Sequence, residues 1–423
     1  MKNTFFLLLL LTSCATPQKE TTGYTAFTGA TLIDGSGSPP VQNAVLLIRD
    51  GRVIAAGTKE KVAIPAGATV RDVTGKYIIP GLINTHAHVG DVIGIEGGHY
   101  SRQNIIDNLS LYARYGITTV VSLGGDHHEA VPLRAENDTT VRQHARLYIA
   151  GEVISGNTPA EAMAVIDSNQ QLGVDFMKIR VDDNLGSSKK MTEDVYRAVI
   201  RRSHEKGYKI ATHMYYLDDA KKLLDAGSDF MAHSVRDKPV DDSFINLMKE
   251  KKVCYCPTLT RELSTFVYGD TAAFFSDEFF RREFDSVTIQ PLKDPARQAK
   301  VKNSVAARTY KQQLPTAMAN LKTLSDRGVT IAMGTDSGIP TRFMGYFEHL
   351  EMEMMAEAGL TPAQIIASAT RQAAECLGLK EVGMLIPGYH ADFIILNDDP
   401  LKDVRNTRKI GAVYVGGDEV RRK

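Results

Sequence analysis

The stretch GLINTHAHVG, residues 81–90, places two histidines one residue apart at the end of an apolar run. The preceding residues, YIIPGLIN, are rich in apolar and β-branched side chains, which predicts a buried β-strand. Successive side chains of a strand point to opposite faces, so His86 and His88 share one face. Two imidazoles on one face can hold one cation, or they can be buried histidines satisfied by backbone carbonyls. Ligands further along the chain decide between these interpretations.

Seven more short apolar segments follow, separated by amphipathic stretches such as DVYRAVIRRSHEKG at 194–207. Strand followed by helix, repeated over about 300 residues, is typical of an α/β protein with a parallel sheet. Eight such units predict a (β/α)8 TIM-like barrel over residues 80–380. The eight expected strands are 82–88, 117–123, 145–155, 175–181, 208–214, 228–234, 252–259 and 329–337.

The two flanking regions differ from this middle part. Residues 23–79 and 381–423 are short strand-like runs punctuated by Gly and Asp-Gly turns. Because both regions share this pattern of short strands and turns, we predict one small β-sandwich domain built from both ends of the chain. Within the barrel region, residues 261–315 are rich in Phe, Arg and Lys. We interpret them as an insertion that covers part of the barrel mouth.

Five of the expected strands carry a potential metal ligand near their C-terminal end. In a barrel these ends form one rim, where active sites lie. One rim placement would be unremarkable, but six at the same relative position favour a shared site. Two of them have other possible roles: Lys178 could be a barrel lysine paired with a carboxylate, and Asp336 could form a turn before Ser337. The six residues are His86, His88, His213, His233, Lys178 and Asp336.

These residues stand in motifs that resemble the amidohydrolase superfamily of metal-dependent hydrolases. The resemblance is strongest to its imidazolonepropionase-like and proline-dipeptidase-like group, and it covers residues 24–420. The motifs are PGLINTHAH, GITTVVSLGG, the lysine of DFMKIRV, ATH, AHS and GTDSG, followed by LTPAQIIASATRQAAECLGL and GMLIPGYHADFIIL. The combination is specific for the superfamily but not for a substrate.

The resemblance implies a site with two divalent metal ions, usually zinc. Carried over by position, the first ion is expected on His86, His88 and Asp336. His213 and His233 are expected to hold the second ion, and Lys178 to bridge both as a carbamate. Burial and nearby positive charge lower the pKa of a lysine, which yields the neutral amine that carbon dioxide can carboxylate.

The implied reaction is hydrolysis of an amide, a cyclic amide or a dipeptide-like C–N bond by a hydroxide that bridges the two ions. Asp336 is expected to be catalytic, because it would take the proton of the attacking water and pass it to the leaving amine. Two alternatives stay open. One is a one-metal, imidazolonepropionase-type hydrolase of cyclic amides, and the other is a lipoprotein that binds a solute or metal without catalysis.

Substrate contacts are less well marked. Arg180 follows Lys178 by two residues and could meet a substrate carboxylate or pair with a neighbouring aspartate. Tyr215 follows the histidine of the fifth strand, and His99 lies beyond the first. RVDDNLGSS and MYY depart from the smaller residues of the dipeptidase-like members, which puts a dipeptide substrate in doubt. The remaining histidines are expected mostly on the surface or in loops.

The first 22 residues read as a signal peptide and tether. One lysine is followed by an apolar run too short to cross a membrane, and then by Leu11-Thr12-Ser13-Cys14. This end resembles a bacterial lipoprotein box, which implies lipidation of Cys14 and an exported protein anchored facing the periplasm or exterior, on the outer membrane by preference. The remaining Cys254, Cys256 and Cys376 are odd in number and lack framework spacing. Cys254 and Cys256 are therefore expected to be small buried apolar residues.

The amino-acid composition limits the classes of molecule that the protein is expected to bind. The 423 residues contain 50 Lys+Arg and 50 Asp+Glu, so the formal net charge is zero. A nucleic-acid-binding protein would usually carry a basic excess, so we expect a small-molecule substrate and no nucleic acid. A homo-oligomer is compatible with this composition, which specifies no oligomeric state.

Overall fold

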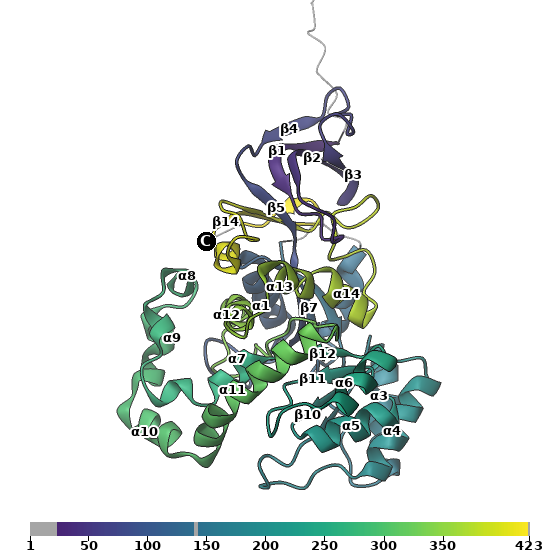
Figure 1. Ribbon diagram of the computed structural model, residues 1–423, viewed down its shortest axis with the longest axis vertical. Helices are drawn as coiled ribbons and strands as arrows, with labels where there is room; N and C mark the ends of the chain where they lie inside the picture. Colours follow the sequence, from purple (N-terminus) through teal and green to yellow (C-terminus); the bar gives the residue numbers. More distant parts are fainter. Residues whose placement is uncertain (1–22, 139–142, 422–423) are drawn as a thin grey trace, which may run out of the picture.

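A computed structural model describes residues 23–138 and 143–421. One eight-stranded sheet joins the two ends of the chain, shown by the purple and yellow strands at the top of Figure 1. The main strand order is β15-β14-β13-β5-β1-β2-β3, and β4 pairs with β1. The strands are β1 (Thr25–Leu32), β2 (Val41–Arg49), β3 (Arg52–Thr58), β4 (Thr69–Asp72), β5 (Tyr77–Pro80), β13 (Phe393–Leu396), β14 (Ile410–Val415) and β15 (Asp418–Glu419).

The contact between the two ends is the antiparallel pair β5–β13, in which Pro80 lies opposite Phe393. Phe27 packs edge-on against Phe393, with ring centroids 5.0 Å apart, and Tyr414 stacks on Phe393 at 4.4 Å. Such aromatic pairs stabilise a packed face beyond the area they bury. The expected pairing of the two ends is therefore observed as one hydrogen-bonded sheet, while the sandwich stays a prediction.

Parallel strands occupy the middle of the chain. A three-stranded sheet has the order β6-β7-β8, and a four-stranded sheet has the order β12-β11-β10-β9. Isolated parallel bridges join Ile154 to Ile179, Tyr255 to Ile331 and Ala87 to Ser337. The expected strand 329–337 thus contributes bridges instead of a continuous strand. The seven strands are β6 (Leu82–Ala87), β7 (Ile117–Ser122), β8 (Arg146–Ile149), β9 (Met177–Val181), β10 (Ile210–Met214), β11 (Phe230–Ala232) and β12 (Cys254–Cys256).

Helices connect these strands, and their sequences explain where several of them begin. The Thr158 hydroxyl caps α3 by accepting from the Glu161 N–H, and Thr361 with Gln364 forms a capping box at α13. The α-helices outside the insertion are α1 (Arg102–Arg114), α2 (Ala130–Ala135), α3 (Pro159–Leu172), α4 (Glu193–Glu205), α5 (Leu217–Ala226), α6 (Asp242–Glu250), α12 (Tyr346–Glu357), α13 (Pro362–Ser368) and α14 (Arg371–Leu377). Among the described residues, no helix is both long enough and apolar enough to span a bilayer.

The expected insertion is helical and extends to one side of the molecule, where α8, α9 and α10 are drawn in Figure 1. Aromatic packing holds it in place: Phe280 lies edge-on to Phe343 with ring centroids 4.9 Å apart. The Arg114 guanidinium also makes two hydrogen bonds of 2.8 Å to the Glu283 carboxylate. The helices here are α7 (Leu259–Ser264), α8 (Glu278–Arg281), α9 (Ser286–Ile289), α10 (Pro295–Asn303) and α11 (Val305–Asp326).

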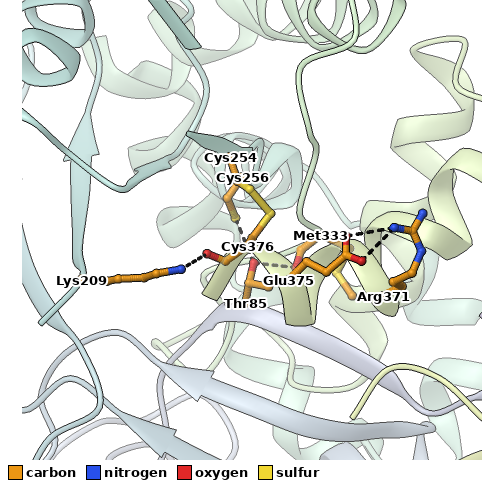
Figure 2. The surroundings of a disulfide bond; sticks show 8 residues. All are labelled: Thr85, Lys209, Cys254, Cys256, Met333, Arg371, Glu375 and Cys376. Atoms are coloured by element: carbon orange, nitrogen blue, oxygen red, sulfur yellow. Dashed lines mark hydrogen bonds and ion pairs between the residues drawn. A yellow bond between two sulfur atoms is a disulfide. The ribbon is translucent and has the colours of Figure 1, made fainter. Parts of the chain in front are cut away.

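The cysteine expectation is wrong for Cys254. Cys254 on β12 and Cys376 on α14 form a disulfide, while Cys256 is free and buried (Figure 2). The two partners are 122 residues apart in the chain, so no local spacing pointed to them. The bond and the hydrogen bond from Lys209 Nζ to the Cys376 carbonyl (3.0 Å) together fasten α14 to the parallel strands.

We expect a Cys376→Ser variant to lose about 2–4 kcal/mol of unfolding free energy, because the cross-link restricts the unfolded chain. Denaturant unfolding of the wild type with and without a reductant measures this. The reductant should lower the wild-type midpoint to that of the variant and leave the variant unchanged. Equal midpoints for oxidised wild type and variant would show that the bond contributes nothing to stability.

Candidate metal centre

His86, His88 and Asp336 meet around one carboxylate oxygen. Asp336 Oδ1 lies 3.3 Å from His86 Nε2 and 2.9 Å from His88 Nε2. One potential ligand atom from each of the three residues lies within 4.8 Å of the others. The expected same-face placement of the two histidines is therefore observed, and the three side chains can hold one metal ion.

His213 and His233 continue this cluster. The His233 ring is 4.6 Å from the His86 ring and 4.2 Å from the His213 ring, measured between centroids. Both residues are buried, at 8% and 1% exposure. Four imidazoles from three separate strand ends thus form one contiguous group.

Lys178 on β9 reaches the same group, with Nζ 3.3 Å from His86 Nε2. It is 3% exposed, and burial lowers the pKa of its amine to about 8, although the Asp336 carboxylate opposes this shift. The amine therefore loses its proton more readily than an ordinary lysine, and its neutral form is the nucleophilic one. All six side chains expected at the strand ends therefore lie together.

Unusual backbone conformations aim two of these side chains. Ala232 packs in an interior cluster with Ala211 and Cys256, so simple alternation would turn the next residue away from that interior. His233 instead has a φ of +76°, and Asp336 has a φ of +60°. Left-handed backbone is rare for residues with a Cβ and gathers at functional sites.

Neighbouring groups fix the orientation of three imidazoles. His88 Nδ1 lies 2.8 Å from the Gly124 carbonyl, and His233 Nδ1 lies 2.8 Å from the Thr258 hydroxyl. His213 Nε2 lies 2.8 Å from a carboxylate oxygen of the buried Asp182. Each ring thus keeps its other nitrogen for a ligand, as in histidines that bind metals.

The protonation states suit a metal as well. Burial lowers the pKa of His86 and His233 well below the usual imidazole value and lowers that of His213 to about 3. These rings are therefore neutral at physiological pH, which ligation requires. His86 Nδ1 is also buried without a hydrogen-bond partner. The donor set fits zinc, which prefers imidazole and carboxylate ligands.

Sequence reasoning missed the groups on the outer side of Asp336. Arg342 forms an ion pair with Asp336 Oδ2, and Arg261 Nε lies 3.8 Å from the same oxygen. Burial raises the pKa of the Asp336 carboxyl, but Arg342, His86 and His88 together hold it well below its usual value. Neither arginine belongs to a strand-end motif, so no local pattern could have identified them.

The expected substrate residues do not lie together. Arg180 is partly exposed, contacts Asp182 and Asn184, and lines a cavity of about 560 Å³. Tyr215 is buried beneath Arg236, whose guanidinium carbon is 4.4 Å from the tyrosine ring centroid. His99 is exposed in the loop between β6 and α1. Cys14 lies outside the described residues.

Two of the remaining histidines, His349 and His390, are buried instead of lying on the surface. His349 is buried, with Nε2 2.8 Å from the Tyr115 carbonyl and Nδ1 3.0 Å from the Thr407 hydroxyl. It therefore serves packing between α12 and its neighbours, away from the strand ends.

Comparisons with known proteins identify the family and the fold of the chain but name no substrate for it. The amidohydrolase family profile matches residues 77–420. The chain belongs to the amidohydrolase family. This confirms the expected amidohydrolase class.

Imidazolonepropionase of Deinococcus deserti is 21% identical over 393 residues, which cover 87% of this chain and 88% of that protein. Enamidase of Eubacterium barkeri is 34% identical over 96 residues, which cover 22% of this chain and only 23% of enamidase. The crystal structure of a Xaa-Pro dipeptidase with methionine in its active site has a TM-score of 0.73 at 20% identity, covering 94% of this chain and 99% of the dipeptidase. This last likeness shows a shared amidohydrolase fold.

Because these imidazoles are buried and neutral, we expect the stability of the metal-free protein to depend on pH. The pKa of His213 is near 3 in the folded chain but about 6.5 when unfolded. Acidification below pH 6.5 therefore adds a proton to the unfolded state first and favours unfolding. Because of His213 alone, the unfolding free energy of the chelator-treated protein should fall by about 2 kcal/mol between pH 6.5 and pH 5.

Denaturant unfolding at both pH values measures this loss. A His213→Gln variant should show a smaller pH dependence, whereas a His128→Gln variant should behave as the wild type, because that side chain is 84% exposed. An unchanged pH dependence in His213→Gln would contradict the assignment of a neutral, buried imidazole.

Proposed function

We propose that the chain is a two-metal hydrolase that cleaves a C–N bond in a small amide, cyclic amide or dipeptide-like substrate. The convergence of six ligand-type side chains in one buried group carries this proposal. The matches to imidazolonepropionase and to a Xaa-Pro dipeptidase support the choice of bond, since both names describe hydrolases of this kind.

In this proposal His86, His88 and Asp336 hold one ion, and His213 and His233 hold the second. Lys178 bridges the two as a carbamate, and zinc is the proposed metal. When bound, the ions supply Lewis acidity and lower the pKa of water toward neutrality. The position of Lys178 favours two ions over one, because a one-metal, imidazolonepropionase-type site has no use for a bridging ligand.

The chain's own residues position the reaction. Asp336 is the proposed acceptor of the proton from the attacking water, and its protonated form would donate to the leaving amine. Asp182 and Thr258 hold the rings of His213 and His233 in fixed orientations, with 2.8 Å contacts to each. Preorganised groups of this kind lower the reorganisation needed during reaction.

We propose further that the two parallel sheets are arcs of one (β/α)8 barrel over residues 80–380. The parallel bridges Ile154–Ile179, Tyr255–Ile331 and Ala87–Ser337 support a closed ring, because they connect the free edges of the two sheets. The proposed second domain consists of residues 23–79 and 381–423, whose strands pair in one sheet.

Export with a lipid on Cys14 is also a proposal. The Cys254–Cys376 disulfide supports it, because structural disulfides form in oxidising compartments and are rare in the cytosol. Fractionation of cells that produce the wild type or a Cys14→Ser variant tests the anchor. Wild type in the membrane fraction and variant in the soluble exported fraction would support lipidation, whereas identical fractions would contradict it.

The metal site is tested by elemental analysis of protein lacking residues 1–22. We expect about two zinc equivalents in the wild type. A Lys178→Ala variant should hold markedly less metal and should lose amidase activity, because the bridging ligand is gone. A Lys189→Ala variant should retain both, since Lys189 is an exposed residue outside the cluster.

One zinc equivalent, unchanged in Lys178→Ala, would overturn the bridged site and favour the one-metal alternative. An absence of bound metal after reconstitution would overturn the hydrolase proposal. An Asp336→Asn variant with bound metal and near-normal turnover would contradict the proton-transfer role.

A further inference from the structure

Helix α12 carries two buried glutamates, Glu348 and Glu351, which are not among the six candidate ligands. They are three residues apart and therefore on one face of the helix, and both are fully buried. Burial raises the pKa of both carboxyl groups, that of Glu351 to about 7. Apolar residues of similar size would avoid the cost of removing carboxylates from water, so packing alone does not account for the two acidic groups.

Three donors converge on one oxygen of Glu348. Its Oε1 accepts hydrogen bonds from the Asn84 side-chain amide at 2.6 Å, the Thr335 hydroxyl at 2.7 Å and the Ser337 hydroxyl at 2.6 Å. Thr335 and Ser337 are the residues on either side of Asp336. One carboxylate oxygen therefore holds both chain neighbours of Asp336 in place.

Asn84 extends the same network to His86. Asn84 Oδ1 accepts from the His86 N–H at 3.0 Å. The His86 carbonyl in turn accepts from the Asp336 N–H at 2.7 Å. The backbone of two candidate ligands of one ion is thus fixed by hydrogen bonds that lead to Glu348.

Glu351 makes a comparable set of hydrogen bonds to the segment after β12. Its Oε1 accepts from the Leu259 N–H, and its Oε2 accepts from the Thr260 N–H and hydroxyl, each at 2.7 Å. These two residues directly follow Thr258, whose hydroxyl lies 2.8 Å from His233 Nδ1. Glu351 therefore holds the turn that orients the His233 ring.

The residues that these glutamates support have unfavourable backbone conformations. The φ angles of Asp336, His233 and Thr258 are +60°, +76° and +47°. Left-handed backbone persists in residues with a Cβ only where the surrounding structure over-determines it. The hydrogen bonds to Glu348 and Glu351 supply such constraints directly beside Asp336 and directly after Thr258.

We propose that Glu348 and Glu351 are positioning residues, each of which presets one half of the metal centre. Glu348 holds Asp336 through its two neighbours, and Glu351 holds the turn that orients His233. This inference rests on the proposed function and deepens it, because in that proposal Asp336 belongs to the first ion and His233 to the second. Loss of each glutamate should therefore weaken the binding of a different ion.

The test measures the zinc affinity of the full chain by competition with a chelator of known zinc affinity. Glu348→Gln keeps the size of the side chain, but a neutral amide accepts hydrogen bonds less strongly than a carboxylate. We expect it to weaken one of the two zinc ions by about tenfold, as is usual when a group that orients metal ligands is lost. Glu351→Gln should weaken the other ion by a similar factor.

A His88→Gln background identifies which ion each glutamate affects, because it removes a proposed ligand of the first ion. In this background Glu348→Gln should have no further effect on the zinc ion that remains. Glu351→Gln should still weaken that ion by about tenfold.

Glu353 provides a matched control on the same helix. Its carboxylate forms an ion pair with Arg408 at 2.6 Å, outside the metal centre, and its side chain is 20% exposed. Glu353→Gln should therefore keep both zinc affinities although it removes an ion pair. The visible absorption of the cobalt-loaded protein gives a second readout, which should change in Glu348→Gln and Glu351→Gln but not in Glu353→Gln.

Milder variants keep the inference testable if a glutamine variant does not fold, as judged by denaturant unfolding. Ser337→Ala removes one donor to Glu348, and Thr260→Val removes the hydroxyl donor to Glu351. Each should weaken the same ion as the corresponding glutamine variant, by a smaller factor.

Unchanged zinc affinities in Glu348→Gln and Glu351→Gln, or an equal loss in Glu353→Gln, would overturn this inference and leave the two-metal hydrolase standing. An absence of bound zinc in the wild type would overturn the proposed function and this inference with it. A single zinc ion, weakened by Glu348→Gln but not by Glu353→Gln, would support the role of Glu348, overturn that of Glu351 and count against the second ion.

Discussion

The Asp336 carboxylate is the group on which the rest of the site depends. One oxygen faces two histidines and the other faces two arginines. Without this negative charge, the buried imidazoles and the guanidiniums of Arg261 and Arg342 would lose the carboxylate that lies between them. Burial of unpaired charge is among the costliest arrangements in a protein, which explains why the neighbouring groups are neutralised or paired. Burial keeps His86, His213 and His233 neutral, and Glu262 pairs with the arginines behind them.

The polar site around Asp336 rests on an apolar cluster and on the Cys254–Cys376 disulfide. Interior side chains of the parallel strands, such as Phe176, Phe230 and Ala211, form a packed cluster that also includes Cys376 and Leu377 of α14. The disulfide joins this cluster from two sides, because Cys254 lies on β12 and Cys376 on α14. A rigid base of this kind allows residues such as His233 and Asp336 to adopt left-handed backbone that would be unfavourable in a flexible loop.

The insertion at residues 261–315 contacts two other parts of the molecule. Its aromatic residues pack against α12, and α11 places Tyr310 beneath the guanidiniums of Arg236 and Arg261. The candidate metal ligands lie at strand ends, whereas Arg236 and Arg261 lie in the segments after β11 and β12 and contact Tyr310 of the insertion. The two groups thus come from different elements of the fold, the candidate ligands from strand ends and the arginines from the segments that follow them.

The sequence by itself determined the parallel strands, the six ligand-type residues and the pairing of the two chain ends. The first two follow from simple strand rules: side chains two apart on a strand share a face, as His86 and His88 do, and parallel strands end at one rim. The pairing of the chain ends followed from the strand-and-turn composition that both ends share. Only the tertiary structure decided the Cys254–Cys376 bond and the position of Arg261 and Arg342 beside Asp336. Cys254 and Cys376 are 122 residues apart, and Arg236, Arg261 and Arg342 come from three separate segments. Such partners are selected by how helices and loops pack around the strands, and no local pattern encodes that packing.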